Sequence, residues 1–391
     1  MDLRMRYLDY AATTPVLPDV LDAMSGAQRD LFGNPSSVYG LGRDSKKALE
    51  EARERVAAAV GAEPGEIVFT AGGTEADNLA LKGAAFRSRA RGTHIITTAV
   101  EHHAVLHSAE WLERQGFRIT HLPVDADGLV DLGALEAALS PETILVSIML
   151  VNNEIGAIEP VAEAVRIVRQ RSRALVHTDA VQGLGKIPVD VKRLGVDCAA
   201  FAAHKIGGPK GVGALYIKRK TPVEAILHGG GQERDLRSGT PNVAGILGFS
   251  VAAEIAARDV GAETPRLAAL RDRLQDGILA SIDRVHVNCA RGPRIPGLVN
   301  LSIDGIEGES LLLMLDAQGI AASSGSACTS GSLDPSHVLT AMGVPPERAL
   351  GSLRLSLGPA STGEDVDALL EALPPIVGRL RSIAPVSAGR R

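Results

Sequence analysis

The stretch "FTAGGTEADNLALKG" at residues 69–83 joins a β-like run to a helical run through a pair of glycines. Backbone N–H groups at the start of a helix can bind an anion, and Gly72 and Gly73 would let a phosphate come close to them. Thr74 and Asp77 also have the spacing of a helix-capping pair, which is the alternative interpretation. The stretch therefore predicts a strand, a turn and a helix, with either a phosphate or a cap at the turn.

The same alternation of β-like and helical runs extends over the first two-thirds of the chain. Further apolar runs lie at residues 94–100, 143–150, 174–180, 196–204 and 213–219. Near-continuous apolar strands that alternate with helices favour an α/β layer with a mainly parallel sheet covered on both faces. From about Gly261 the pattern changes to a long helix at 264–282, short strands and a final helix near 364–382, which predicts a smaller α+β domain.

The composition argues against several classes of protein. A net charge of −5 over 391 residues does not suit a domain that binds nucleic acid through bulk positive charge. We find neither an uncharged apolar run near the ~18 residues of a membrane span nor the apolar core of a signal peptide. Three cysteines argue against a disulfide framework. Together these features favour a cytoplasmic protein without membrane contact.

Two charged residues follow apolar strands at positions that could carry chemistry. Asp179, with Gln182 nearby in "HTDAVQGLGK", follows a strand at the edge where α/β sheets bind ligands, although it could simply cap a loop. Lys205 follows a strand and a histidine. In a dry pocket its pKa would be lowered and its amine could attack carbonyls. The alternative is that its aliphatic chain packs at the strand end while its charge stays in water. A phosphate turn, an acid and a lysine are together what a pyridoxal phosphate site requires.

The stretch "SSGSACTSGS" at residues 323–332 places Cys328 among small, uncharged residues. Buried structural cysteines usually have apolar neighbours, as Cys198 and Cys289 do. The stretch instead predicts a mobile arm whose thiol could enter a pocket and leave it again. His103 and His107, four residues apart, could form a zinc pair, but no third ligand is near in sequence, so we expect no metal.

Motifs along the chain resemble those of the cysteine desulfurases, within the class V aminotransferase-like, fold-type I family of pyridoxal phosphate enzymes. They are "YLDYAATTP", "GNPSSVYGLGR", "FTAGGTEADNLALKG", "EHHAVL", "NNEIGAIEP", "HTDAVQGLGKIPVDV", "HKIGGPKGVGALYI", "GGGQERDLRSGTPN", "SSGSACTSGS" with "PSHVL", and "SLRLSLG". The resemblance covers about residues 7–370, and the arm is similar to that of the iron–sulfur and nitrogen-fixation branch. It implies a large domain at 14–258 with a mainly parallel, seven-stranded type of sheet, and a small α+β domain from 1–13 and 259–391.

The resemblance also implies roles in binding the coenzyme. Lys205 would hold pyridoxal phosphate covalently, Asp179 would pair with its ring nitrogen, and Gln182 would donate to its phenolic oxygen. His102 would stack on the ring and move protons. The phosphate would be bound by Gly73, Thr74, His204 and, from the neighbouring subunit of a homodimer, Thr240. Ala202 stands where the family often has a serine that contacts the phosphate.

The substrate would be L-cysteine, with its carboxylate held by Asn153 and Arg354 and its sulfur taken by Cys328 as a persulfide. L-alanine would leave, and the sulfur would pass to an acceptor protein such as an iron–sulfur scaffold, a tRNA thiolation enzyme or a DNA phosphorothioation protein. Two alternatives remain: a selenocysteine lyase or other class V aminotransferase, and a non-catalytic scaffold for sulfur-transfer partners.

Overall fold

The computed structural model describes residues 5–324 and 334–383. Its largest sheet has seven strands, in the order β2-β8-β7-β6-β5-β3-β4, and only β8 runs antiparallel to its neighbours. The strands are β2 (Ile67–Thr70), β3 (His94–Thr98), β4 (Arg118–Leu122), β5 (Thr143–Ser147), β6 (Leu175–Asp179), β7 (Cys198–Ala202) and β8 (Gly213–Ile217). The predicted mainly parallel α/β sheet is confirmed.

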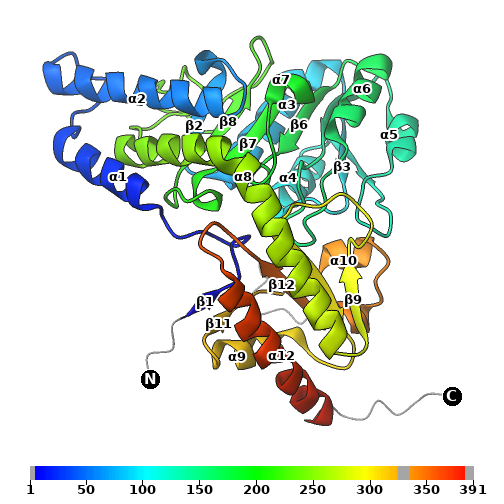
Figure 1. Ribbon diagram of the computed structural model, residues 1–391. Coiled ribbons are helices and arrows are strands. Elements are labelled where there is room, and N and C mark those ends of the chain that lie inside the picture. The colour runs from blue at the N-terminus through cyan, green and yellow to red at the C-terminus, as the bar shows by residue number, and fades with distance from the viewer. Residues whose placement is uncertain (1–4, 325–333, 384–391) are drawn as a thin grey trace.

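Helices cover both faces of this sheet, and together they form the large lobe (Figure 1). Along β2, Ile67 and Phe69 pack into one apolar core and Val68 into another, because neighbouring side chains of a strand point to opposite faces. The first core is closed by α2 (Gly40–Ala59), α5 (Leu132–Ala138), α6 (Val161–Arg171), α7 (Val191–Leu194) and α8 (Val243–Ser281). The second is closed by α3 (Gly73–Ser88) and α4 (His103–Arg114).

The C-terminal third forms a small lobe around an antiparallel sheet of order β12-β10-β9. Its elements are β9 (Val285–Asn288), β10 (Leu298–Ile303), α9 (Gly308–Asp316), α10 (His337–Ala341), α11 (Pro346–Ala349), β12 (Ser352–Ser356) and α12 (Gly363–Ile383). The N-terminal strand β1 (Arg6–Tyr7) pairs with β11 (Ile320–Ala321), and Leu8 belongs to the apolar core of this lobe. The N-terminal segment therefore starts in the small lobe before the chain enters the large one.

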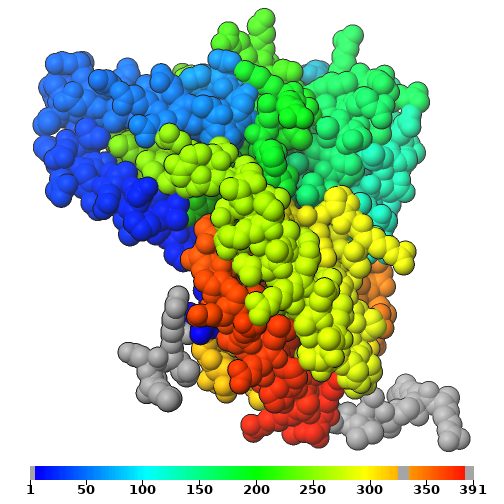
Figure 2. All heavy atoms as spheres, in the orientation of Figure 1, coloured from blue at the N-terminus to red at the C-terminus, as the bar shows by residue number. Residues whose placement is uncertain are grey.

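Helix α8 connects the two lobes and is longer than predicted. It runs without a break for 39 residues, and Pro265 lies inside it, so the expected start near residue 264 is wrong. One end packs on α1 (Pro18–Asp30) and α2, and the other on α12, as the space-filling view shows (Figure 2). The division at residues 258 and 259 falls within this helix and remains a proposal.

The loop after β8 is ordered against the edge of the large sheet. Glu233, Arg234 and Asp235 have φ angles of 49°, 58° and 64°, in the left-handed region that non-glycine residues rarely adopt. The buried Glu233 carboxylate accepts hydrogen bonds from Arg53 at 2.7 and 2.9 Å and from the Phe69 N–H at 2.8 Å. These charge-assisted bonds offset the cost of the unusual backbone and hold the loop in place.

Two arginines of this loop, Arg234 and Arg237, have their hydrogen-bond partners in the same chain. Arg234 donates to the carbonyl of Ile67 at 2.6 Å, and Arg237 donates to Glu75 at 2.8 Å. Both arginines therefore hold the loop against β2 and α3 of their own chain.

We predict that Arg53→Leu lowers the free energy of unfolding by about 3–5 kcal/mol, because it leaves the Glu233 carboxylate buried without its cation. Urea denaturation of the purified variant measures this loss. The double variant Arg53→Leu/Glu233→Gln should recover part of it, since no unpaired charge remains. Glu50, the exposed second partner of Arg53, provides the control: Glu50→Gln should cost less than about 1 kcal/mol. Equal losses from Arg53→Leu and Glu50→Gln would contradict this interpretation.

Candidate active site

One edge of the large sheet collects the predicted site residues. Strands β2, β3, β5, β6 and β7 run in the same direction, so their carboxyl ends meet at that edge. A cavity of about 260 Å³ lies there, and Arg354 reaches it from β12 of the small lobe. Its lining includes Gly73, Thr74, His102, Asn153, Asp179, Gln182, His204, Lys205 and Arg354. Nine predicted residues, far apart in sequence, thus line a single cavity.

Lys205 ends the short helix η3 (Ala203–Lys205), directly after β7. Its Nζ donates to the carbonyls of Ala11 and Ala12 at 2.7 and 2.8 Å. The following turn is fixed by Gly207, which has a φ of 84° and donates its N–H to Thr14 Oγ1 at 2.7 Å. The N-terminal motif "DYAATTP" therefore forms one wall of the site, a role that sequence reasoning did not assign although the motif was noted.

Asp179 is the last residue of β6 and is buried. Its Oδ1 accepts the Val181 N–H at 2.9 Å. Burial raises the pKa of Asp179 to about 6, while that hydrogen bond and the positive charge of Lys205 oppose the rise. At neutral pH the side chain is therefore mostly ionised, as a partner for a protonated ring nitrogen must be.

His102 is the N-cap of α4, where its Nδ1 accepts the Ala104 N–H at 3.1 Å. An amide N–H can only donate, so Nδ1 carries no proton and the ring proton lies on Nε2. Burial and the charge of Lys205 lower the pKa of His102 to about 4. The imidazole is consequently neutral and presents an N–H at Nε2, which can donate a hydrogen bond.

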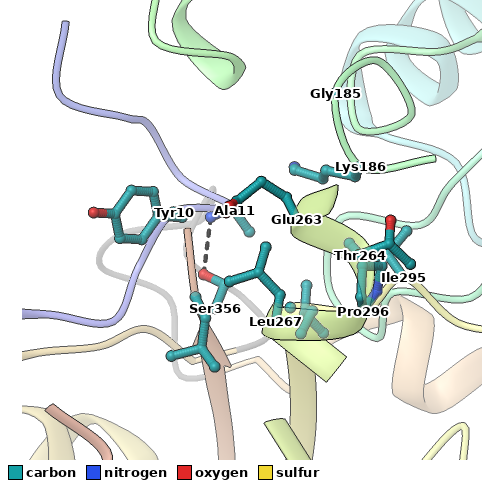
Figure 3. Close-up of a pocket in the computed structure, with 13 residues that line it drawn as sticks. Tyr10, Ala11, Gly185, Lys186, Glu263, Thr264, Leu267, Ile295, Pro296 and Ser356 are labelled. Atoms are coloured by element: carbon teal, nitrogen blue, oxygen red, sulfur yellow. Dashed lines mark hydrogen bonds between the residues drawn. The ribbon is translucent and has the colours of Figure 1, made fainter. Parts of the chain in front are cut away.

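Gln182 is fixed at both ends of its amide. Its Nε2 donates to the Ala11 carbonyl at 2.8 Å, and Lys186 donates to its Oε1. Lys186 borders a second, smaller cavity between the N-terminal segment and α8, where the Ala11 N–H donates to Ser356 Oγ at 2.8 Å (Figure 3). Burial and the nearby cations Lys205 and Arg354 hold the pKa of Lys186 well below its usual value. Sequence reasoning missed Lys186, although it ends the quoted motif "HTDAVQGLGK".

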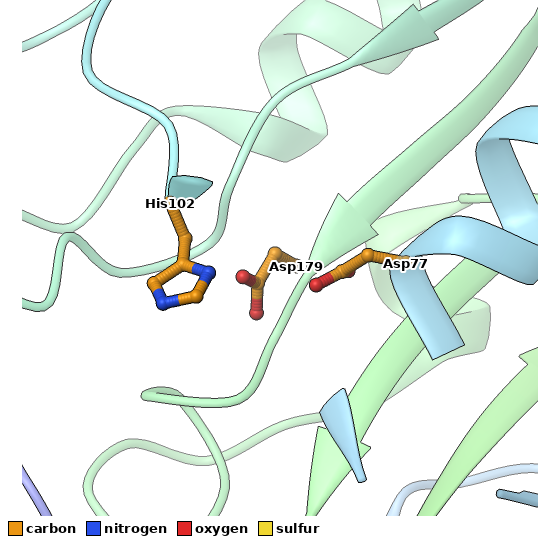
Figure 4. Close-up of side chains that lie close together, drawn as sticks. All are labelled: Asp77, His102 and Asp179. Atoms are coloured by element: carbon orange, nitrogen blue, oxygen red, sulfur yellow. The ribbon is translucent and has the colours of Figure 1, made fainter. Parts of the chain in front are cut away.

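The turn between β2 and α3 is suited to an anion rather than to a side-chain cap. Gly72 is the N-cap, and no side chain of the described residues caps this helix, so the predicted Thr74–Asp77 capping pair is wrong. Asp77 instead points into the protein interior, towards Asp179 (Figure 4). A Cβ on Gly73 would lie 2.6 Å from Val181 Cγ2, so any larger residue here would force Val181 to shift. Ala202 is buried at the same cavity.

Arg354 is held by the large lobe and by the N-terminal segment. Its Nη1 donates to the carbonyl of Asn153 at 3.0 Å and its Nη2 to Asp9 at 2.8 Å. Its Nε is buried and has no hydrogen-bond partner within the described ranges. A fixed guanidinium at the wall of the cavity is suited to bind a carboxylate.

Two predicted residues are not placed in this cavity. Thr240 is exposed and lines a separate cavity of about 110 Å³ with Ala71 and Arg237, beside the β2–α3 turn. Cys328 lies outside the described residues. The two other cysteines, Cys198 and Cys289, are buried, which confirms that they belong to the core.

Known proteins resemble this chain over nearly its whole length. The family model described as aminotransferase class-V matches residues 6–369. The cysteine desulfurase IscS of Methanosarcina thermophila is 51% identical over 97% of this chain and 94% of its own. The chain belongs to the class V aminotransferases, in their cysteine desulfurase branch. An IscS-like cysteine desulfurase of Mycobacterium tuberculosis is 49% identical over 98% of this chain and 99% of its own.

A solved NifS-like protein has the same fold, with a TM-score of 0.90 and 40% identity over 96% of this chain and 100% of that one. The fold-type I prediction is thereby confirmed. Pyridoxal phosphate is the coenzyme of this enzyme family, and the cavity fits it. The lysine amine suits the aldehyde of the coenzyme, and the mostly ionised carboxylate suits its ring nitrogen. The neutral imidazole suits the face of the ring, and the helix start without a side-chain cap suits the phosphate.

We predict that the imidazole of His102 stays neutral, with its proton on Nε2, at every pH above about 5. The reason is that Ala104 occupies Nδ1 and burial opposes a positive charge. ¹⁵N NMR of histidine-labelled protein, with His102→Gln for assignment, reports the tautomer and its titration. A proton on Nδ1, or a His102 titration near neutral pH, would contradict this prediction.

Proposed function

We propose that this cysteine desulfurase converts L-cysteine to L-alanine and transfers the sulfur to Cys328 as a persulfide. The observation that carries the proposal is the single cavity in which Lys205, Asp179, His102 and Arg354 meet. Lys205 would hold the coenzyme, with Asp179 at its ring nitrogen, Gln182 at its phenolic oxygen and His102 on its face. Its phosphate would be bound by Gly73, Thr74 and His204, and by Thr240 of a second subunit.

The residues of this chain then have distinct tasks. Arg354 and Asn153 bind the carboxylate of cysteine and orient it, Arg354 through its fixed guanidinium. Pyridoxal phosphate, when bound, withdraws electrons from the Cα of the substrate. Asp179 carries the negative charge opposite the ring nitrogen. The amine of Lys205, once the substrate amine has replaced it on the coenzyme, would take the proton from Cα, because it lines the cavity while Nδ1 of His102 already accepts the Ala104 N–H.

Sulfur transfer needs no external oxidant or reductant. The Cys328 thiolate attacks the sulfur of the substrate and an S–S bond forms. The carbon–sulfur bond breaks, and its electron pair remains with the carbon, which takes up a proton and leaves as alanine. The thiolate is the reactive form, so Cys328 must lose its proton before the attack. Nδ1 of His102 accepts the Ala104 N–H and Nε2 carries the ring proton. Lys205 or the substrate amine is therefore a better acceptor than His102 for the proton of Cys328.

The persulfide would then pass to an acceptor protein, and we propose an iron–sulfur scaffold or a thiolation enzyme, on the resemblance described above. We also propose that the enzyme works as a cytoplasmic homodimer. The exposed position of Thr240, in a cavity beside the turn that would bind the phosphate, supports a contribution from one subunit to the site of the other. None of the helices in the described ranges combines the length and the apolar character that crossing a bilayer requires.

Cys328→Ser should bind pyridoxal phosphate and still change colour with L-cysteine, because Cys328 acts only after the coenzyme has activated the substrate. Alanine formation should fall by about a thousandfold or more, and no persulfide should form, since a hydroxyl is a poor nucleophile toward sulfur. Cys198→Ala and Cys289→Ala are the matched controls and should keep turnover. Alanine is measured directly, and mass spectrometry detects the added sulfur atom. Wild-type turnover in Cys328→Ser would favour an aminotransferase instead.

If Thr240 binds the phosphate of the partner subunit, Thr240→Val should weaken coenzyme binding by about tenfold or more, through loss of a charge-assisted hydrogen bond. Lys205→Ala should bind the coenzyme without turnover. In a mixed dimer of these two variants, one site combines Lys205 with an intact Thr240 from the other subunit. Its activity should show the wild-type dependence on coenzyme concentration.

The comparison is the Thr240→Val homodimer, titrated with coenzyme under the same conditions. A mixed dimer that needs as much coenzyme as this homodimer would show that Thr240 acts within its own subunit. A fully active monomer in sedimentation experiments would contradict the shared site altogether.

A further inference from the structure

Asp77 is a buried carboxyl beside the coenzyme cavity for which the mechanism above has no use. It lies in the second turn of α3, is 1% exposed and lines the cavity. Its Oδ1 has no hydrogen-bond partner among the described residues. Figure 4 shows its side chain directed at Asp179, with His102 on the far side of that carboxylate. Burying a polar atom without a partner is costly, so a group kept in this state needs a physical explanation.

A neutral histidine lies beside Asp77. His177, in β6, has its Nε2 3.4 Å from Asp77 Oδ1, and its Nδ1 is 2.9 Å from the hydroxyl of Ser147. Burial lowers the pKa of His177 to about 3, so the ring carries no positive charge. When the Ser147 hydroxyl donates to Nδ1, the ring proton lies on Nε2 and faces Asp77. His177 therefore offers Asp77 a weak dipole but no counter-charge.

Asp77 and Asp179 compete for a single negative charge. Oxygen atoms of the two carboxyls lie within 4.8 Å of one another, together with a ring nitrogen of His102. Two ionised carboxylates so close in a buried site repel strongly, so one of them keeps its proton. Asp179 has the Val181 N–H at 2.9 Å and the charge of Lys205 in its favour. Asp77 has neither, and burial and repulsion by Asp179 and Glu101 raise its pKa well above the usual value.

We propose that Asp77 is a positioning residue that stays protonated and keeps the negative charge of this pair on Asp179. As a neutral acid it can donate to the Asp179 carboxylate and stabilise its charge, whereas an ionised Asp77 would compete for the proton of the ring nitrogen. The proposal rests on the proposed role of Asp179 toward the coenzyme. Asp77 touches no reacting atom in it; it acts through Asp179.

Two variants distinguish the effect of the donated proton on coenzyme binding from the effect of side-chain size. Asp77→Asn keeps a neutral group that can donate, and Asp77→Leu keeps the size but cannot donate. We expect Asp77→Asn to bind pyridoxal phosphate within about twofold of wild type, and Asp77→Leu to bind about tenfold more weakly, as for the loss of one hydrogen bond to a charged group. Titration of the apoproteins with the coenzyme, followed by absorbance, measures both values. The proposal is overturned if Asp77→Asn loses as much affinity as Asp77→Leu, or if neither loses any.

The pH dependence of apoprotein stability gives a readout without the coenzyme. A carboxyl that keeps its proton when folded but loses it when unfolded makes the folded state less stable as the pH rises from the unfolded pKa toward the folded one. Asp77→Asn removes this loss, so its melting temperature should rise relative to wild type as the pH increases above about 4, the usual pKa of an unfolded aspartate. If the difference stays constant over this range, Asp77 is not protonated and the proposal fails, whether or not Asp77→Leu folds.

Glu159 supplies the matched control. It is also buried, burial raises its pKa to about 8, and it does not line the cavity. Glu159→Gln should show the same gain in melting temperature with pH but leave coenzyme affinity unchanged. A loss of coenzyme affinity in Glu159→Gln equal to that of Asp77→Leu would assign the effect to general destabilisation and overturn the role of Asp77. A wild-type protein that takes up no coenzyme would instead refute the proposed function, so the two failures are distinguishable.

Discussion

The direction shared by six of the seven strands is the constraint from which the site follows. It brings the carboxyl ends of β2, β3, β5, β6 and β7 to one edge, between two layers of helices. Ionisable side chains at those ends are partly shielded from water, which favours their neutral form. The pKa of a buried acid therefore rises, and the pKa of a buried histidine falls. Burial is the largest cause both of the raised pKa of Asp179 and of the lowered pKa of His102, to which the charge of Lys205 also contributes. The chemistry of the site is thus a consequence of strand direction and burial.

The N-terminal segment connects this edge to the small lobe. The carbonyl of Ala11 accepts hydrogen bonds from both Lys205 and Gln182, and its N–H donates to Ser356 of β12. Arg354, two residues earlier in β12, is held in turn by Asp9 and by the carbonyl of Asn153 in the large lobe. The groups proposed to bind the substrate carboxylate are therefore complete only when both lobes are docked. Disturbing this small set of contacts would affect coenzyme and substrate sites together.

The parts of this arrangement that the sequence could predict are those that depend on local pattern. Asp179 and Lys205 follow runs of apolar residues, so their position at strand ends was predictable from hydrophobicity alone. The role of Ala11 was not, because a backbone carbonyl has no side-chain signature. Asp77 was misassigned to a helix cap because the spacing from Thr74 is local, whereas its burial depends on packing against β6 and β7. Family resemblance, rather than physical reasoning, supplied the roles of Thr240 and Cys328.

The contacts on either side of residues 325–333 bear on how a thiol from that segment could serve this cavity. Before it, the backbone of Ser323 pairs with that of Arg354, with N···O distances of 2.7 and 3.2 Å. After it, the hydroxyl of Ser336 donates to Glu154 at 2.5 Å, next to Asn153. Both flanks are thus attached beside the residues proposed to bind the substrate carboxylate. This shortens the loop that must close to bring a thiol to the substrate.

Burial raises the pKa of Glu154 to about 7, so near neutral pH its hydrogen bond with Ser336 alternates between a neutral and a stronger, charge-assisted form. The strength of the attachment that holds one flank therefore depends on the protonation state of the buried Glu154 carboxyl.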